Sequence, residues 1–214
     1  MTRERLKSRP VTSLEGKLIV FEGADGAGKT TLLQAILDLL LGACVKVERF
    51  AFPGAEAGTI GRLVYDIHHQ PASFGIGAIA PVSLQTLHVA AHADAIQTRI
   101  LPALRSGACV LLDRFWWSTW VYGVVAGVPA RILRPLIEFE RTVWGATRPK
   151  IIIHLVRPGG GDPEVEAQYA RLAARERRAV QVMRIATDRS VEATRDAVIA
   201  SLLSPSSRSA RARA

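Results

Sequence analysis

The chain is poor in the residues that hold small secreted proteins together and in the apolar runs that cross membranes. Among its 214 residues only two are cysteines, Cys44 and Cys109. Both lie in apolar contexts, so we interpret them as small core residues, not as a disulfide or a metal site. No apolar run approaches the roughly 18 residues of a membrane span, and the charged segment 1–10 has no apolar stretch behind it. We therefore expect a cytoplasmic protein without a membrane partner.

Negative charge is also scarce. The chain has 28 Lys and Arg against 19 Asp and Glu, a formal net charge of +9. Such an excess attracts phosphate-bearing molecules. Part of it lies in a basic N-terminal arm, residues 1–16, and in a tail of Ser, Arg and Ala, residues 204–214, which we expect to be disordered. Nucleic-acid binding by these ends stays open, although solvated termini are the favoured interpretation.

The apolar residues, 49% of the chain, suit one domain with a sizeable core, which we assign to residues 17–203. Apolar runs alternate with amphipathic ones, as in parallel strands joined by crossover helices, so we predict an α/β fold. The expected strands are 17–21, 45–50, 110–113, 150–156 and 181–185. The expected helices are 29–41, 58–68, 83–105, 130–144, 163–178 and 191–203.

The most informative motif is Gly23-Ala24-Asp25-Gly26-Ala27-Gly28-Lys29-Thr30, which satisfies G-x-x-x-x-G-K-[ST] directly after an expected strand. Small residues let successive backbone N–H groups turn toward phosphates, and the following helix adds its dipole. Lys29 would hold the β- and γ-phosphates and the Thr30 hydroxyl would hold Mg²⁺. A Gly-rich turn without a ligand is the alternative. The expected nucleotide-binding residues are Gly23, Asp25, Gly26, Ala27, Gly28, Lys29, Thr30 and Thr31.

A second functional pair follows the third expected strand. Asp113 ends this strand, and ligands of open α/β sheets bind at the carboxyl edge. We expect Asp113 to meet the Mg²⁺ held by Thr30, usually through water, instead of serving only as a helix cap. Arg114 comes next, and its guanidinium can take a phosphate in bidentate fashion. We predict that it clamps the acceptor phosphate or the transferred group.

Further motifs give the chain, over most of residues 17–203, a resemblance to the thymidylate kinases, a family of P-loop nucleoside-monophosphate kinases. The resemblance rests on Phe21-Glu22-Gly23 and the loop, Phe52-Pro53-Gly54 with Gly58-Thr59-Ile60-Gly61, Ile100-Leu101-Pro102-Ala103-Leu104, Asp113-Arg114-Phe115, Ser118-Thr119, Tyr122, Arg148-Pro149 and Tyr169-Ala170-Arg171-Leu172-Ala173. It implies a three-layer fold with a five-stranded parallel sheet flanked by helices. It also implies ATP and Mg²⁺ as cofactors, with transfer to the 5′-phosphate of a pyrimidine deoxynucleotide, dTMP first.

The same resemblance assigns the acceptor side of the site. Asp25 would accept a hydrogen bond from the sugar 3′-hydroxyl, and Arg114 would hold the acceptor phosphate. Ser118 and Tyr122 would line the nucleoside pocket. Phe52 and Pro53 belong to the same expected substrate site.

At the base-reading positions the chain departs from the family. The family places an aromatic residue and, one helical turn later, an Arg before the Ile-Leu-Pro-Ala-Leu run, whereas this chain has His88 and His92. They share one helix face, so both can touch a base, but an imidazole cannot supply the Arg fork. Two ordinary surface histidines are an equally good interpretation, and a metal pair is a weaker one. The family's Arg ahead of the Pro-Gly element is Ala51 here, and Arg49 lies two residues upstream.

The family's helical lid, whose arginines close over the phosphates, is essentially missing. Its interval holds only Pro158-Gly159-Gly160-Gly161-Asp162-Pro163-Glu164 and the following few residues. Phosphoryl transfer needs positive charge on the equatorial oxygens. The candidate donors are Arg157, Arg171 and Arg175, and the alternative is charge from a second subunit or from the acceptor.

The sequence therefore predicts a nucleotide kinase similar to thymidylate kinase. A kinase for a modified nucleotide or for a nucleotide within DNA stays open, as does an ATP-binding regulatory module with negligible transfer. The aromatic group Trp116, Trp117 and Trp120 follows Arg114 and is interpreted as core or as part of a homodimer interface, in preference to a nucleic-acid stacking surface.

Overall fold

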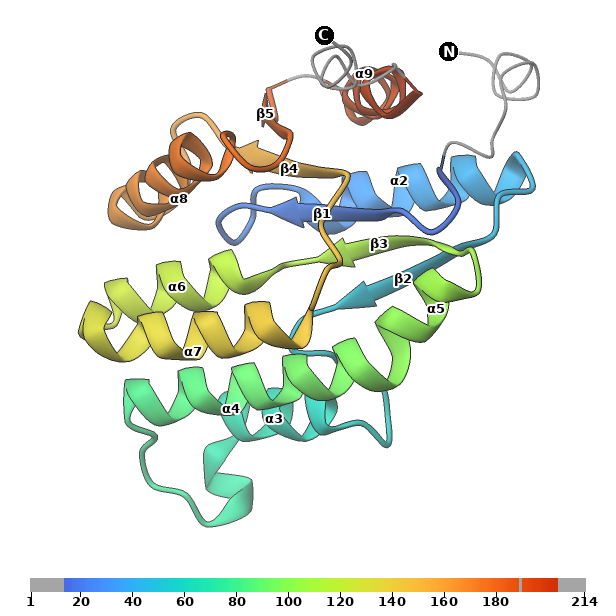
Figure 1. Cartoon of the computed structure of the whole chain (residues 1–214). Helices are drawn as coiled ribbons and strands as arrows, with labels where there is room; N and C mark the ends of the chain where they lie inside the picture. The colour runs from blue at the N-terminus through green and yellow to red at the C-terminus, as the bar shows by residue number, and fades with distance from the viewer. Residues whose placement is uncertain (1–13, 189, 204–214) are drawn as a thin grey trace, which may run out of the picture.

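Five parallel strands form one sheet in the order β2-β3-β1-β4-β5. The computed structural model describes residues 14–188 and 190–203 (Figure 1). The strands are β1 (Leu18–Glu22), β2 (Val47–Ala51), β3 (Cys109–Asp113), β4 (Ile151–Val156) and β5 (Val182–Ala186). This confirms the predicted fold, because each expected strand is present with ends shifted by no more than two residues.

The sheet is buried on both faces, which makes the fold three-layered. Successive residues of β1 point to opposite faces, as the period of a strand requires. Leu18 and Val20 therefore belong to one apolar cluster, whereas Ile19 and Phe21 belong to a second. A parallel sheet covered on both sides is typical of α/β proteins.

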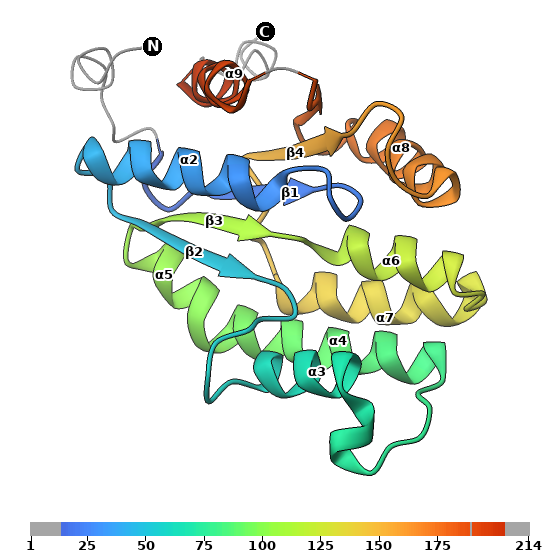
Figure 2. The same cartoon turned by 180° about the vertical axis from the view of Figure 1, so that it is seen from behind.

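Helices form the outer two layers, as the view from behind also shows (Figure 2). They are α2 (Lys29–Gly42), α3 (Ile60–His69), α4 (Pro81–Ala95), α5 (Leu101–Arg105), α6 (Trp116–Val125), α7 (Ala130–Val143), α8 (Pro163–Glu176) and α9 (Val191–Leu203). Buried residues of α2 and α9 join the cluster on one face of the sheet. Residues of α5 to α8 join the cluster on the other face, and α3 packs on α4.

Helix α6 was not predicted. Its residues Trp116–Val125 are nearly all apolar, and the helix is buried on most sides, so no amphipathic period marks it. Trp116 and Trp117 are 2% and 0% exposed, which confirms their interpretation as core residues. The single helix expected over 83–105 is α4, a π-helical turn at Ile96–Ile100 and then α5.

Two expectations from the sequence need correction, one about where the folded domain begins and one about the burial of Cys44. Leu14 is 1% exposed and belongs to the core cluster beside α2, so the folded domain begins before residue 17. Cys44 is exposed, not a core residue, while Cys109 is buried, and both are free thiols. The disorder expected for 1–13 and 204–214 lies outside the described residues. Within the described ranges, no helix is both long and apolar enough to cross a membrane.

Candidate functional site

The loop between β1 and α2 lies at the carboxyl edge of the sheet, next to the end of β3. Parallel pairing aligns Phe21 with Asp113, so residues that follow both strands meet at one place. No residue with a side chain fits at position 23, because a Cβ there would lie 2.3 Å from the Leu155 carbonyl oxygen of β4. Gly28 precedes α2 with φ +83°, a left-handed conformation that glycine adopts without strain.

Lys29 lies beneath this loop and is 6% exposed. Its Nζ donates hydrogen bonds to the carbonyl oxygens of Gly23 at 2.8 Å and Ala24 at 2.7 Å. Burial and repulsion by Arg114 lower the pKa of the Lys29 ammonium, against the attraction of nearby carboxylates. The loop thus holds a desolvated cation where the motif predicts the phosphates.

Thr30 and Asp113 form the candidate metal site. Thr30 Oγ1 donates a hydrogen bond to Asp113 Oδ2 at 3.1 Å, so the predicted metal ligands are adjacent without an intervening group. The other carboxylate oxygen, Asp113 Oδ1, is buried and has no hydrogen-bond partner among the residues that the structure describes. A hydroxyl and an orphaned carboxylate oxygen are the hard oxygen ligands that Mg²⁺ takes beside phosphates, so these residues suit that ion.

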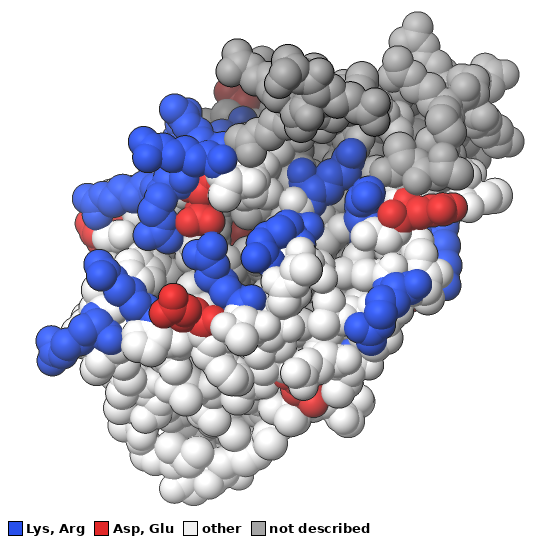
Figure 3. Space-filling view, in the orientation of Figure 1, with Lys and Arg blue, Asp and Glu red and all other residues white. Residues whose placement is uncertain are grey.

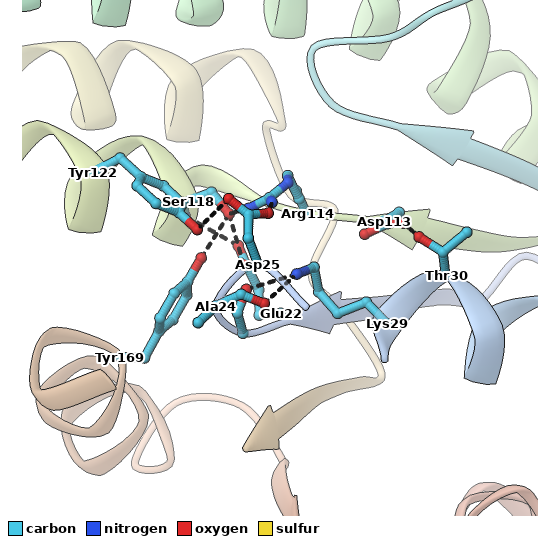
Figure 4. Close-up of polar contacts among 11 residues, drawn as sticks. Glu22, Ala24, Asp25, Lys29, Thr30, Asp113, Arg114, Ser118, Tyr122 and Tyr169 are labelled. Carbon is cyan, nitrogen blue, oxygen red and sulfur yellow. Dashed lines mark hydrogen bonds and ion pairs between the residues drawn. The ribbon is translucent and has the colours of Figure 1, made fainter. Parts of the chain in front are cut away.

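Arg114 lies between the loop and α6 (Figure 4). Its guanidinium forms an ion pair with Asp25 and donates to Ser118 Oγ at 3.0 Å. Tyr122 Oη donates to the second oxygen of Asp25 at 3.0 Å. Burial alone would raise the pKa of Asp25, but Arg114 and Tyr122 outweigh it and hold that pKa below its ordinary value. Arg114 itself has φ +72°, an unusual backbone conformation for a residue other than glycine.

Glu22, at the end of β1, organises this site and was not predicted to have a role. It is 0% exposed, and its Oε1 accepts the backbone N–H groups of Phe115 at 2.7 Å and Ser118 at 3.2 Å. Its Oε2 accepts Ser118 Oγ–H at 2.9 Å, and Ser118 Oγ also contacts Tyr169 Oη at 2.8 Å. Burial raises the pKa of Glu22 to about 7. A charged residue ending an otherwise apolar strand next to the loop was the available signal.

The expected substrate residues line one cavity of about 720 Å³. They are Asp25, Phe52, Pro53, His88, His92, Arg114, Ser118 and Tyr122. Helix α3 adds Tyr65, His68 and His69, which the sequence gave no reason to single out. The structure therefore brings every predicted acceptor residue together, on segments far apart in the chain.

His88 and His92 are not ordinary surface residues. His92 is 2% exposed, its ring stacks on Phe52 with centroids 4.0 Å apart, and its Nδ1 lies 2.9 Å from Glu140 Oε2. His88 lines the cavity beside His68, and burial lowers the pKa of His88 to about 3. Within the described part of the chain, no group of three or more His, Cys, Asp or Glu is placed to hold a metal.

The three candidate charge donors lie in different surroundings. Arg157 follows β4, and a Cβ on Gly26 would lie 3.7 Å from its Nη1, so it is beside the phosphate loop. Arg171 is 3.7 Å from Glu164, and the Arg175 guanidinium lies 6.0 Å from the rings of Trp116 and Trp120.

Basic side chains also gather on one face of the molecule. Figure 3 shows Lys and Arg over the part of the surface where Figure 1 places α8. Arg49 donates to Gln34 and does not line the acceptor cavity, but it lines a neighbouring cavity that shares Ala51, Pro53, Gly54 and Ala55 with it.

The fold and the site define a P-loop protein that places a phosphate-binding loop beside a nucleotide-sized cavity. Comparisons with known proteins narrow this class. The thymidylate kinase family model matches residues 21–198. Thymidylate kinase of Pelotomaculum thermopropionicum is 32% identical over 169 residues, which cover 78% of this chain and 74% of the relative. The chain therefore belongs to the thymidylate kinase family.

Other matches differ in extent. Thymidylate kinase of Thermoanaerobacter sp. (strain X514) is 37% identical over 109 residues, so the match spans about half of each protein, 51% in both cases. The crystal structure of thymidylate kinase from Ehrlichia chaffeensis superposes with a TM-score of 0.68 at 20% identity, over 88% of this chain and 98% of that one. At this identity the superposition shows the shared fold.

Proposed function

We propose that the protein transfers the γ-phosphoryl group of ATP to the 5′-phosphate of a nucleotide, most readily dTMP, in a Mg²⁺-dependent reaction. One observation carries the proposal. A second cavity of about 340 Å³ surrounds the phosphate loop and shares Asp25, Thr30 and Arg114 with the acceptor cavity. A donor in one cavity and an acceptor in the other would meet at these shared residues.

The chain's own residues supply charge and position. An oxygen of the acceptor phosphate attacks the γ-phosphorus, a P–O bond forms, and the bond to the ADP oxygen breaks. Lys29 neutralises charge on the donor phosphates, and Arg114 holds the acceptor phosphate. Asp25 orients the acceptor sugar by accepting a hydrogen bond from its 3′-hydroxyl. Mg²⁺ on Thr30 and Asp113 supplies further charge to the donor phosphates when it is bound.

A kinase for a modified nucleotide or a nucleotide within DNA is the second candidate. Only residues 157–162 join β4 to α8, so no helical lid lies between these two elements, and basic side chains lie nearby (Figure 3). An open basic site suits a larger acceptor. A regulatory module without transfer has less support, because Lys29, Thr30, Asp113 and Arg114 are all retained. A cytoplasmic location is part of the proposal, since free nucleotides are the proposed substrates. Homodimer formation stays a prediction.

The test is an acceptor panel of nucleoside monophosphates and short oligonucleotides with labelled ATP and increasing Mg²⁺. We expect dTMP to be the best acceptor. We expect Asp113→Asn to shift the Mg²⁺ titration to higher concentration with the fold intact, since it removes charge but keeps shape. Asp38→Asn, an exposed carboxylate on α2, is the matched control. If only oligonucleotides were labelled, the second candidate function would be favoured over a dTMP kinase. If no acceptor were labelled, the kinase proposal would be contradicted.

A further inference from the structure

Gln85 on α4 is a buried amide without a partner. It is 5% exposed, yet no hydrogen bond is formed by its side chain among the described residues, and its Oε1 is fully buried. It lines the acceptor cavity together with His88, which lies three residues later on the same helix. Leaving a buried amide unpaired destabilises the protein, because the amide gives up its hydrogen bonds to water without replacing them. A ligand in the cavity is the natural source of the missing partners.

The side chain of Gln85 packs closely against α6 at Gly123. Helix α6 has no side chain at Gly123, where a Cβ would lie 3.3 Å from Gln85 Cγ. The terminal torsion of a glutamine is broad, so the amide can turn to present its donor and its acceptor side by side. A buried amide that lines a cavity is suited to recognising a flat partner with a matching pair of polar atoms.

The other polar groups that line the cavity are either engaged or uncharged, and Thr119 Oγ1 is a further buried atom without a partner among the described residues. His92 is occupied by Glu140 on one side and by Phe52 on one ring face. His88 Nε2 is buried without a partner, so this imidazole adds a neutral polar atom beside Gln85. Of the described residues that line this cavity, none is a Lys and only Arg114 is an Arg, and it is engaged with Asp25 and Ser118. Neutral groups therefore provide the available hydrogen bonds where the base would lie.

We propose that Gln85 is a specificity-determining residue that hydrogen-bonds to the edge of the acceptor base. Its Oε1 accepts the N3–H of a pyrimidine imide, as in thymine or uracil, and its Nε2 donates to the O4 carbonyl oxygen. An amide paired in this bidentate way discriminates between bases about 10- to 100-fold. This inference rests on the proposed function, since it places a nucleotide base in the acceptor cavity.

The experiment compares dTMP with N3-methyl-dTMP, which lacks the N3–H donor, in the wild type and in Gln85→Met. Methionine has a similar volume and no amide, so the variant should fold with an unchanged or higher melting temperature. We expect kcat/KM for dTMP to fall about 10- to 100-fold in Gln85→Met, mainly through KM, with the KM of ATP unchanged. The penalty for N3-methylation should be large in the wild type and nearly absent in the variant.

Gln97→Leu is the matched control, because Gln97 is an exposed amide in the adjoining π-helical turn and does not line the cavity. Gln85→Asn, a shorter amide, should fall between the wild type and Gln85→Met and keeps the test usable if methionine is not tolerated. An equal N3-methyl penalty in the wild type and in Gln85→Met would overturn the inference and leave the kinase proposal standing. A wild type that labels no nucleotide would contradict the proposed function itself.

Discussion

The cavity around the phosphate loop and the acceptor cavity share lining residues, and their two ends hold polar groups in different ways. We call the part at Lys29, Thr30, Asp113 and Arg114 the phosphate end, and the part at Gln85 and His88 the base end. At the phosphate end, most charged groups are held by partners inside the protein: Lys29 by loop carbonyls, Arg114 by Asp25, and one oxygen of Asp113 by Thr30. At the base end, Gln85 Oε1 and His88 Nε2 are buried and unpaired among the described residues. A ligand entering the phosphate end must exchange existing contacts, apart from the unpaired Asp113 Oδ1, whereas one entering the base end completes missing ones. The first arrangement preorganises charge, and the second provides selectivity.

The largest expected effect comes from breaking the phosphate end. Lys29→Ala should lower kcat about a thousandfold or more, because Lys29 is the only cation within the loop motif, and removing one preorganised donor already costs 10²–10³. Single-turnover phosphoryl transfer is the measurement. Lys46→Ala is the control, since Lys46 is exposed and bonds only to Ser106. Near-normal turnover of Lys29→Ala would remove the basis of the comparison.

Glu22 tests whether the phosphate end depends on a buried, titrating carboxylate. Its pKa is raised from 4.5 to about 7, so its contribution to stability is complete below pH 4.5 and is lost as the pH rises through 7. Relative to Glu22→Gln, which cannot ionise, the wild type should therefore lose about 3 kcal/mol of unfolding free energy across that window. Urea denaturation of both proteins at pH 4.5 and pH 8 measures this.

Glu48→Gln is the control, because Glu48 is an exposed glutamate outside the site. A wild-type-minus-Glu22→Gln difference that does not change with pH would show that Glu22 does not titrate between these values.

The missing lid provides a third test. Arg157→Ala should lower kcat about a hundredfold with little change in ATP affinity, because its guanidinium lies beside the loop. Arg171→Ala and Arg175→Ala should have smaller effects, since these side chains are engaged with Glu164 and with tryptophan rings. Steady-state kinetics of the three variants decide the order, with Arg105→Ala on α5 as the control. If Arg175→Ala has the lowest kcat of the three variants, the charge comes from α8 and not from Arg157.

The smallest expected effect tests whether position 92, at the base end, contacts the acceptor base. His92→Arg should raise kcat/KM for dTMP relative to other acceptors about tenfold, since a guanidinium adds a bidentate fork and Glu140 remains to pair with it. Competition between dTMP and dCMP for labelled ATP measures the ratio. An unchanged acceptor ranking would mean that position 92 forms a wall of the cavity and does not contact the base.

The sequence could predict the phosphate end because its residues are contiguous or end a strand. The loop Gly23–Thr30 and the pair Asp113 and Arg114 are each local patterns, and the order of a parallel sheet brings them together. Glu22 was within the same pattern, but its role depends on where α6 begins, and α6 carries no amphipathic signal.

The base end could be predicted only in part. Family positions pointed to His88 and His92, but not to their partners. Glu140 comes from α7, Gln85 occupies space left by Gly123 of α6, and His68 comes from α3. No spacing along the chain encodes contacts between four helices, so burial and missing hydrogen bonds could be seen only in three dimensions.

The positive φ of Arg114 has a geometric consequence for the whole site. Asp113 extends along the strand toward Thr30, and the left-handed turn at the next residue sends Arg114 toward the acceptor cavity. A single peptide link, about 3.8 Å between Cα atoms, therefore sets the offset between the metal-facing and acceptor-facing groups. The donor-facing and acceptor-facing groups are therefore aligned by the backbone of two consecutive residues, whereas the base contacts depend on how α3 and α4 pack around the cavity.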